Sequence, residues 1–196
     1  MYTPKDMSTP VRHHRYTYEE YRRLEDESDT RHEYLDGDIY AMAGGTPEHA
    51  AKAGDIVGIL RAQLPPGCRV YTSDLRVRVP GTGLTTYPDA AVICGGVLRA
   101  SDDPLAAVNP VLLAEVTSPS TEDYDRGEKL EHYQKLPGLR EVLIASHREP
   151  RLTLHRREDE SWRTLSAGPG ETLPLVSIAG SIAVDEVYRD EFNVGT

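Results

Sequence analysis

The chain has 196 residues, of which 38% are hydrophobic and 28% are charged, so it is long enough for one domain with its own core and too apolar to be disordered. Its formal net charge of −10 argues against a protein that coats nucleic acid electrostatically, although a nuclease with an acidic metal site remains compatible with it. We find no signal peptide and no apolar run near the ~18 residues that a membrane span requires, so no membrane contact is expected.

The two cysteines, Cys68 and Cys94, form no CxxC pattern. Isolated cysteines of this kind are usually reduced in cytoplasmic proteins. We therefore expect two core thiols in a cytoplasmic protein, and neither a disulfide nor a zinc site.

The N-terminal part of the sequence predicts a tail, a short helix and a hairpin. Residues 1–15 are polar and predict a flexible tail, which leaves 16–196 as a single domain. Thr17 and Glu20 have the spacing of a capping box, which predicts that a helix begins there. The pair Asp36-Gly37 lies between alternating segments and predicts a hairpin within residues 32–42.

A longer helix and a strand are predicted next. Thr46 followed by Pro47 is typical of a helix start, and a Pro-Pro-Gly run ends the same helix. The alternation of Arg69 to Val79 predicts one strand with a solvent-exposed face, on which Arg76 and Arg78 would lie.

The second half of the chain predicts alternating strands and helices. In chain order we expect a strand after Asp89, a polar loop at about 95–109, a buried strand at 111–116, a helix at 122–136, a strand at 139–146 and a hairpin within 152–165. This order predicts a mixed α/β fold, in which helices flank a central mixed sheet and hairpins lie toward both ends.

Glu115 interrupts the apolar strand at 111–116. An ionised carboxylate there is costly unless it is paired or bound to a metal, so Glu115 is a site candidate. Asp89 has a comparable place at the start of the preceding apolar strand. Together they predict a site for a hard cation such as Mg²⁺ or Mn²⁺. The alternative is that backbone N–H groups of residues 118–121 satisfy Glu115 and that Asp89 is a turn residue.

Lys129 lies four residues after Asp125 and four before Tyr133, so the three side chains share one helical face. Phosphodiester cleavage needs a cation that steadies the charge developing on the phosphate, and Lys129 could supply it. The alternative is an exposed lysine that pairs with Asp125.

These motifs resemble the Uma-two family, which comprises restriction-endonuclease-like proteins of the PD-(D/E)XK nuclease superfamily. The resemblance covers about residues 16–188 and rests on Glu33-Tyr34-Leu35-Asp36-Gly37, Thr46-Pro47-Glu48-His49, Pro88-Asp89, Ala114-Glu115-Val116, Ser118-Pro119-Ser120-Thr121, Asp125-Arg126-Gly127-Glu128-Lys129 and Tyr133. It implies a PD-(D/E)XK core and a magnesium-dependent nuclease, with DNA as the expected substrate.

The resemblance also implies a role for each site residue. Asp89 and Glu115 would hold the metal, Lys129 would orient water or stabilise the phosphate, and Glu33 would be an auxiliary acid. His49 and Tyr133 would support these groups. The superfamily pattern places a lysine two residues after the glutamate, where this chain has Thr117, so Lys129 would have to replace it from the next helix.

Two other classes of function stay open at this point. A nuclease-like fold that no longer cuts could serve as a binding or assembly module, and the acidic net charge favours that reading. A glycosidase-like carboxylate pair would need an aromatic sugar groove, for which one Trp and one Phe are a poor supply despite eleven Tyr. An exposed sheet edge or the late hairpin could also support a homodimer.

Overall fold

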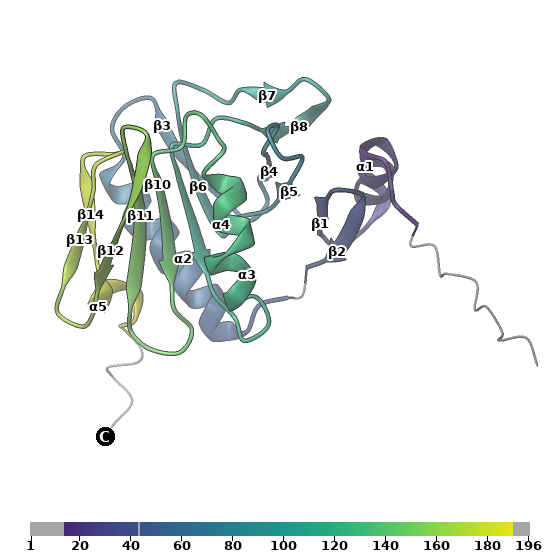
Figure 1. The fold of residues 1–196 in the computed structure, drawn as a ribbon. Coiled ribbons are helices and arrows are strands. Elements are labelled where there is room, and N and C mark those ends of the chain that lie inside the picture. Colours follow the sequence, from purple (N-terminus) through teal and green to yellow (C-terminus); the bar gives the residue numbers. More distant parts are fainter. Residues whose placement is uncertain (1–13, 43, 190–196) are drawn as a thin grey trace, which may run out of the picture.

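The computed structural model describes residues 14–42 and 44–189, and a six-stranded mixed sheet forms its centre (Figure 1). The strand order is β12-β11-β10-β9-β6-β3, in which β9 and β10 are parallel and the other neighbours are antiparallel. The strands are β3 (Cys68–Thr72), β6 (Ala90–Cys94), β9 (Leu112–Val116), β10 (Glu141–Ala145), β11 (Leu152–Glu158) and β12 (Ser161–Ala167). The predicted mixed α/β fold class is confirmed.

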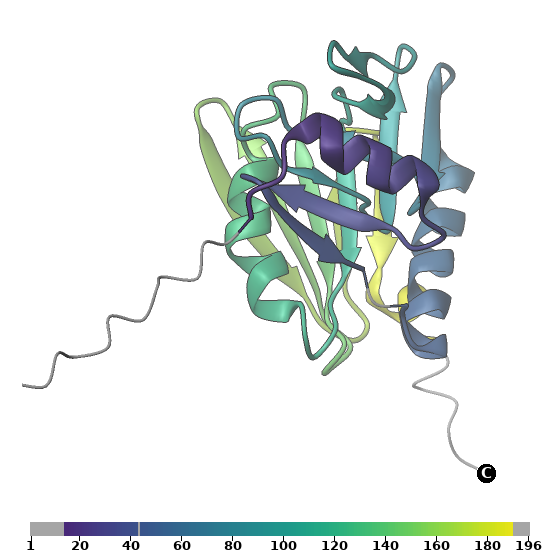
Figure 2. The ribbon, with the colours of Figure 1, turned by 90° about the vertical axis from the view of Figure 1, so that its right-hand side faces the viewer.

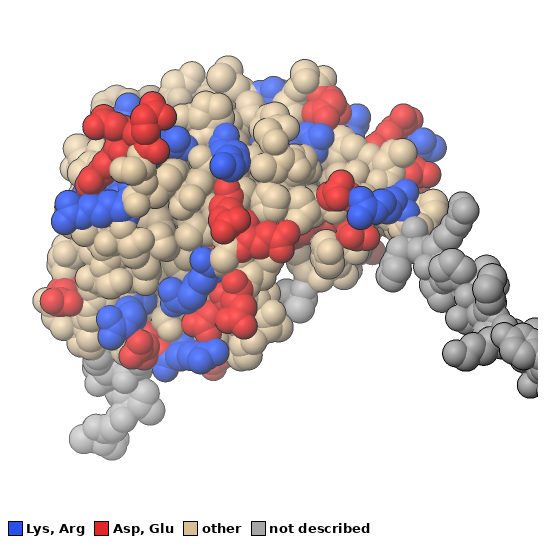
Figure 3. All heavy atoms as spheres, viewed as in Figure 1, with Lys and Arg blue, Asp and Glu red and all other residues tan. Residues whose placement is uncertain are grey.

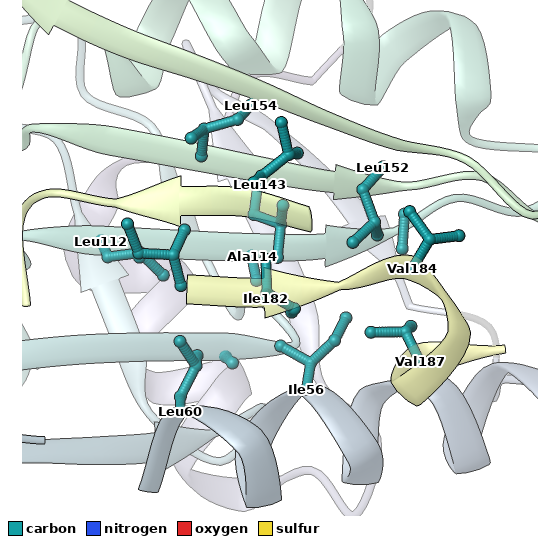
Figure 4. Packing of buried hydrophobic residues seen from close by; sticks show 14 of the residues in the cluster. Ile56, Leu60, Leu112, Ala114, Leu143, Leu152, Leu154, Ile182, Val184 and Val187 are labelled. Atoms are coloured by element: carbon teal, nitrogen blue, oxygen red, sulfur yellow. The ribbon is translucent and has the colours of Figure 1, made fainter. Parts of the chain in front are cut away.

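Helices pack on both faces of the central sheet. On one face, Ile56 and Leu60 of α2 (Pro47–Gln63) point at Leu112 and Ala114 (Figure 4). The hairpin of β13 (Thr172–Leu175) and β14 (Gly180–Ala183) and the short helix α5 (Val184–Val187) complete this core. On the other face lie α3 (Glu122–Arg126) and α4 (Glu128–Tyr133).

Strand alternation decides which face each side chain of β9 takes. Ala114 belongs to the core under α2, whereas Leu113 belongs to the core under α4. Glu115 therefore lies on the α4 face, which is the face that carries the candidate site.

A second sheet packs beside α4 and has the strand order β2-β1-β5-β4-β8-β7. Its strands are β1 (His32–Leu35), β2 (Asp38–Ala41), β4 (Arg76–Arg78), β5 (Thr85–Thr86), β7 (Arg99–Ala100) and β8 (Asp103–Ala107). Helix α1 (Tyr18–Glu27) lies across the β1–β2 hairpin (Figure 2). This sheet supplies Glu33, from β1, to the site.

The locally encoded expectations are confirmed. Thr17 and Glu20 form the capping box of α1, and Thr46 caps α2 with Pro47 in its first turn. The Asp36-Gly37 turn joins β1 to β2, and the late hairpin is β11–β12. Residues 1–13 of the expected tail lie outside the described residues.

The single strand predicted over residues 69–79 is wrong. A turn, in which the Leu75 N–H donates to the Thr72 carbonyl at 3.0 Å, separates β3 from β4, and the two strands belong to different sheets. Arg76 is buried, because its guanidinium donates to Asp103 at 2.9 Å and to the Tyr87 hydroxyl at 2.8 Å. Arg76 therefore forms a buried ion pair and does not belong to a solvent-exposed strand face.

Two further boundaries differ from the sequence expectation. The segment at 95–109 contains β7 and β8 and is not only a loop. The helix at 122–136 breaks at Gly127, which has φ −110° and ψ −104° and joins α3 to α4. A Cβ at this glycine would lie 2.9 Å from the Asp123 carbonyl oxygen, so the break depends on a residue without a side chain.

The expectation of two free thiols is also wrong, because Cys68 and Cys94 form a disulfide. They are paired across β3 and β6, and the Gly95 N–H donates to the Gly67 carbonyl at 3.0 Å. This makes them a non-hydrogen-bonded pair, the arrangement that brings opposite side chains closest, and their Cα atoms are 4.0 Å apart. Strand register, which cysteine spacing does not reveal, brings them together.

None of the helices in residues 14–42 and 44–189 is long and apolar enough to cross a membrane.

Removing the disulfide should weaken the protein. It links residues 26 positions apart, and closing a loop of this size stabilises a fold by about 3 kcal/mol. We expect the double variant Cys68→Ser/Cys94→Ser to lose about that much free energy of unfolding in urea denaturation. Dithiothreitol should reproduce the loss in the wild type and leave the variant unchanged; two free thiols in unreduced, unfolded wild type would contradict the pairing.

Candidate active site

The candidate site lies where β9 ends and β6 begins. Ala90 and Ala114 are paired across these antiparallel strands, so the next position along the register sets Asp89 opposite Glu115. The Val116 N–H donates to Asp89 Oδ2 at 2.7 Å, which fixes the Asp89 carboxylate at the end of β9. The two acids proposed as metal ligands are therefore neighbours on one edge of the central sheet.

Lys129 joins this edge from α4. Its Nζ lies 2.8 Å from Glu33 Oε1, 3.1 Å from Glu115 Oε1 and 3.6 Å from Asp125 Oδ1. The Lys129 side chain is 5% exposed, so the ammonium is buried among the three carboxylates. The structure brings Lys129 to the acids from the following helix, as the displaced-lysine interpretation requires, and the exposed-lysine alternative does not hold.

Hydroxyl groups hold the acids in place. The Tyr133 hydroxyl donates to Glu115 Oε1 at 2.5 Å, and the Thr86 hydroxyl donates to Glu33 Oε1 at 2.5 Å. Glu115 is thus satisfied mainly by side chains of α4 and not by the turn at 118–121. Tyr133 thus contacts Glu115, and its supporting role stays a prediction. Thr86 lies in a two-residue strand, and no sequence motif indicated that it would contact Glu33.

His49 lies at the rim of the site. Thr46 caps α2, and the helix start places His49 Nε2 3.4 Å from Asp89 Oδ2. The His49 side chain is 22% exposed and that of Asp89 is 15% exposed, against 6% for Glu115. The site is therefore more open to solvent at Asp89 and His49 than at Glu115.

Burial and crowding of charge control the acid–base behaviour of the site. Burial raises the pKa of Glu115 to about 8; Asp89 and Asp125 add to the rise, while Lys129 and the Tyr133 hydroxyl oppose it. Burial acts in the opposite direction on Lys129, but Glu115 and the other carboxylates outweigh it and hold the lysine pKa well above its usual value. The ammonium is therefore charged throughout the physiological range.

The pKa values of His49 and Asp125 are raised as well. The hydrogen bond to Asp89 raises the pKa of His49 above its ordinary value, against the effect of its partial burial. Burial raises the pKa of Asp125, although Lys129 opposes the change. The two shifts thus have different main causes, the contact with Asp89 for His49 and burial for Asp125, and the charges of nearby carboxylates add to both.

A divalent cation fits the negative charge of this site. Glu33, Glu115 and Asp125 surround the Lys129 ammonium, and Asp89 adds a further carboxylate opposite Glu115. Burial is the main cause of the raised pKa of Glu115, and the charges of Asp89 and Asp125 add to it. No group of three or more His, Cys, Asp or Glu side chains within the described residues is arranged to hold an ion by itself. Magnesium is commonly bound by one or two carboxylates and completes its shell with water and substrate phosphate, so the pair of Asp89 and Glu115 is a sufficient donor set.

One more side-chain contact at this end of the sheet was not predicted from the sequence. Thr117 follows β9 and contacts His147, which follows β10; the Thr117 Oγ1 lies 2.9 Å from His147 Nδ1. The parallel pairing of β9 with β10 predicts that their ends meet, but it does not identify the residue beyond β10 that reaches Thr117.

Comparisons with known proteins identify a family model and two related sequences. A family model named Uma2 and described as "Putative restriction endonuclease" matches residues 18–185. The uncharacterized protein slr1290 of Synechocystis is 37% identical over 173 residues, which span 87% of this chain and 90% of the relative. A second uncharacterized Synechocystis protein, sll1609, is 28% identical over 131 residues, which span 65% of this chain and 73% of that relative.

A solved structure confirms the fold. The crystal structure of "a putative nuclease belonging to DUF820" from Anabaena variabilis superposes with a TM-score of 0.70 and covers 87% of this chain and 96% of that one. The identity is 17%, so the likeness concerns the restriction-endonuclease-like fold alone.

The raised pKa of Glu115 makes the stability of the protein depend on pH. The carboxyl group has a pKa of 4.5 in an unfolded chain and of about 8 in the fold, so between these values the folded protein binds more protons. The free energy of unfolding should therefore fall as pH rises through this window, by about 1.4 kcal/mol for each unit of pKa difference. Urea denaturation from pH 5 to 8.5 in EDTA should show this fall, and Glu115→Gln should flatten it.

Glu131→Gln is the matched control, because Glu131 lies on the same helix with an exposed side chain. It should leave the pH profile unchanged. A Glu115→Gln profile that overlays the wild type would contradict the assigned titration.

Proposed function

This chain belongs to the Uma2 family of restriction-endonuclease-like proteins, and on that basis we propose that it is a metal-dependent nuclease that hydrolyses phosphodiester bonds in DNA. The observation that carries the proposal is the meeting of Asp89, Glu115 and Lys129, from three different elements, at one edge of the central sheet. An acid pair beside a buried cation is the arrangement that metal-assisted phosphoryl chemistry uses.

In this proposal Asp89 and Glu115 bind Mg²⁺ or Mn²⁺. When bound, the ion would act as a Lewis acid toward the phosphate and favour the ionisation of the attacking water. Asp89 is kept in position by the Val116 N–H, and Glu115 by the Tyr133 hydroxyl. Both carboxylates are thus oriented before any ion arrives, which lowers the reorganisation that binding requires.

Lys129 contributes a fixed positive charge. Glu33 and Asp125 would keep Lys129 in place when Glu115 holds an ion. The lysine is then available to orient water or to stabilise charge that develops on the phosphate. Glu33, itself held by Thr86, acts as an auxiliary acid that positions Lys129, and His49 orients Asp89 from the rim.

Surface charge limits how the protein would bind its substrate. Lys and Arg side chains are interspersed with Asp and Glu on the face that carries α3 and α4 (Figure 3). With a net charge of −10, the protein would bind DNA through the metal and local contacts and not through a broad basic surface.

The cellular setting is part of the same proposal. A DNA substrate favours a cytoplasmic location, whereas the Cys68–Cys94 disulfide is more typical of an oxidising compartment. A homodimer formed through an edge strand of the central sheet, β3 or β12, stays a prediction.

A binding or assembly module without catalysis is the second candidate. One observation favours it: Lys129 already pairs with Glu33, Glu115 and Asp125 and so compensates part of their charge without an ion. Metal titration separates the two functions, because a module of this kind has no need of an ion at Asp89 and Glu115.

We expect the purified protein to nick supercoiled DNA with Mg²⁺ or Mn²⁺ and to be inactive in EDTA. Asp89→Asn and Glu115→Gln remove metal ligands and should lower both Mn²⁺ affinity, measured by calorimetry, and the cleavage rate, the latter roughly 100-fold or more. Lys129→Ala should lower the rate by a similar factor while it retains Mn²⁺ binding. Linear, single-stranded and RNA substrates assayed in parallel define the substrate class.

Glu131→Gln serves again as the matched carboxylate control and should cleave like the wild type. Cleavage that survives in Asp89→Asn would point to a contaminating nuclease. Tight Mn²⁺ binding without cleavage of any substrate, or binding unaffected by Asp89→Asn, would favour the non-catalytic module.

A further inference from the structure

Thr117 lies two residues after Glu115, at the position where the superfamily pattern has its lysine. The Thr117 N–H donates to the Ala145 carbonyl at 2.9 Å, so the pairing of β9 with β10 continues through this residue. Strand alternation then directs the side chains of Glu115 and Thr117 to the same face of the sheet. Thr117 is 1% exposed, and its hydroxyl is buried at the edge of the candidate site.

The Thr117 hydroxyl holds His147 with two contacts. The His147 backbone N–H donates to Thr117 Oγ1 at 3.0 Å, and the imidazole Nδ1 lies 2.9 Å from the same oxygen. One contact fixes the backbone and the other fixes the ring, so the orientation of the imidazole is determined. Because Nδ1 faces Thr117, Nε2 lies on the opposite side of the ring.

His147 lies at the same end of the central sheet as Thr117. It follows β10 as Thr117 follows β9, and the carboxyl ends of neighbouring parallel strands are where ligands bind in such sheets. The next residue, Arg148, pairs with Glu122 at 2.6 Å, which attaches this segment to the start of α3. Helix α3 also carries Asp125, one of the carboxylates around Lys129.

We propose that His147 is a further substrate-contacting residue, whose Nε2–H donates a hydrogen bond to a non-bridging oxygen of the DNA phosphate next to the metal site. This inference rests on the proposed nuclease function. In this proposal the Thr117 hydroxyl donates to Nδ1, so that the ring proton lies on Nε2, on the side of the ring away from Thr117. His147, held by Thr117, thus stabilises the phosphate through a hydrogen bond. The superfamily pattern has a lysine at the position of Thr117, which would stabilise the phosphate through its charge.

A purely structural role is the alternative, and the chain contains a matched example of it. Thr164 Oγ1 lies 3.1 Å from His155 Nδ1 across β11 and β12, so a threonine also holds a histidine ring there. His155 is paired with Val142 near the start of β10, away from the carboxyl end where His147 lies. His155 is therefore a control for the loss of a Thr–His contact as such.

Two substitutions at His147 separate the ring atoms. The Asn side chain reaches about as far as Nδ1, so His147→Asn can keep the contact to Thr117 but loses the outer donor. The Gln amide reaches about as far as Nε2, so His147→Gln retains that donor. We expect His147→Asn to lower the cleavage rate roughly 10- to 100-fold, and His147→Gln to recover most of the loss. His155→Asn should match the wild type.

A binding measurement makes the test independent of turnover. In Ca²⁺, fluorescence anisotropy with a short DNA duplex should show weaker binding by His147→Asn than by the wild type, while Mn²⁺ affinity and melting temperature stay unchanged. If the wild type binds DNA but does not cleave it, and His147→Asn weakens that binding, the nuclease function is wrong but the contact between His147 and DNA is supported. Equal cleavage and equal binding by wild type and His147→Asn, a loss matched by His155→Asn, or no DNA binding by the wild type would overturn the inference.

Discussion

The buried ammonium of Lys129 connects the elements that form the candidate site. Lys129, from α4, contacts Glu33 of the second sheet, Glu115 of the central sheet and Asp125 of α3. A buried carboxylate is tolerated when an opposite charge and hydrogen bonds compensate its desolvation, and removal of one partner from such a group is strongly destabilising. The position of each of these elements is therefore tied to the position of Lys129, and the break at Gly127 lets α4 turn so that the lysine reaches the acids.

The proposed role of Glu115 as a metal ligand conflicts with the stability of the fold. Burial of Glu115, with the charges of Asp89 and Asp125 added to it, raises the pKa of its carboxyl group and costs folding free energy near neutral pH. A site that is unfavourable for the fold and well held by Tyr133 and Thr86 is what a binding or catalytic role requires.

Local signals in the sequence predicted local structure well. The starts of α1 and α2 and the β1–β2 turn depend on residues three or fewer positions apart, such as Thr17 and Glu20, so the sequence alone was sufficient. The motif order likewise identified Glu33, Asp89, Glu115 and Lys129, which the structure brings together; their catalytic roles stay predictions.

Contacts between residues far apart in the sequence were not predicted. Arg76 alternates with valines as an exposed residue would, but its partner Asp103 comes 27 positions later in another strand. The Cys68–Cys94 bond and the Thr117–His147 contact likewise depend on strand register, which neither residue of a pair reveals. Only the paired strands show that these side chains meet.

The place of Lys129 in the chain has a consequence for folding during synthesis. Glu33, Asp89 and Glu115 are all made before α4, so the growing chain contains the acids before the lysine that compensates them. Until residue 129 leaves the ribosome, β9 cannot bury Glu115 beside its counter-ion, and the contacts that close the site span much of the sequence. The central sheet is thus expected to form late. The nascent chain is expected to become compact only after Lys129 has been synthesised.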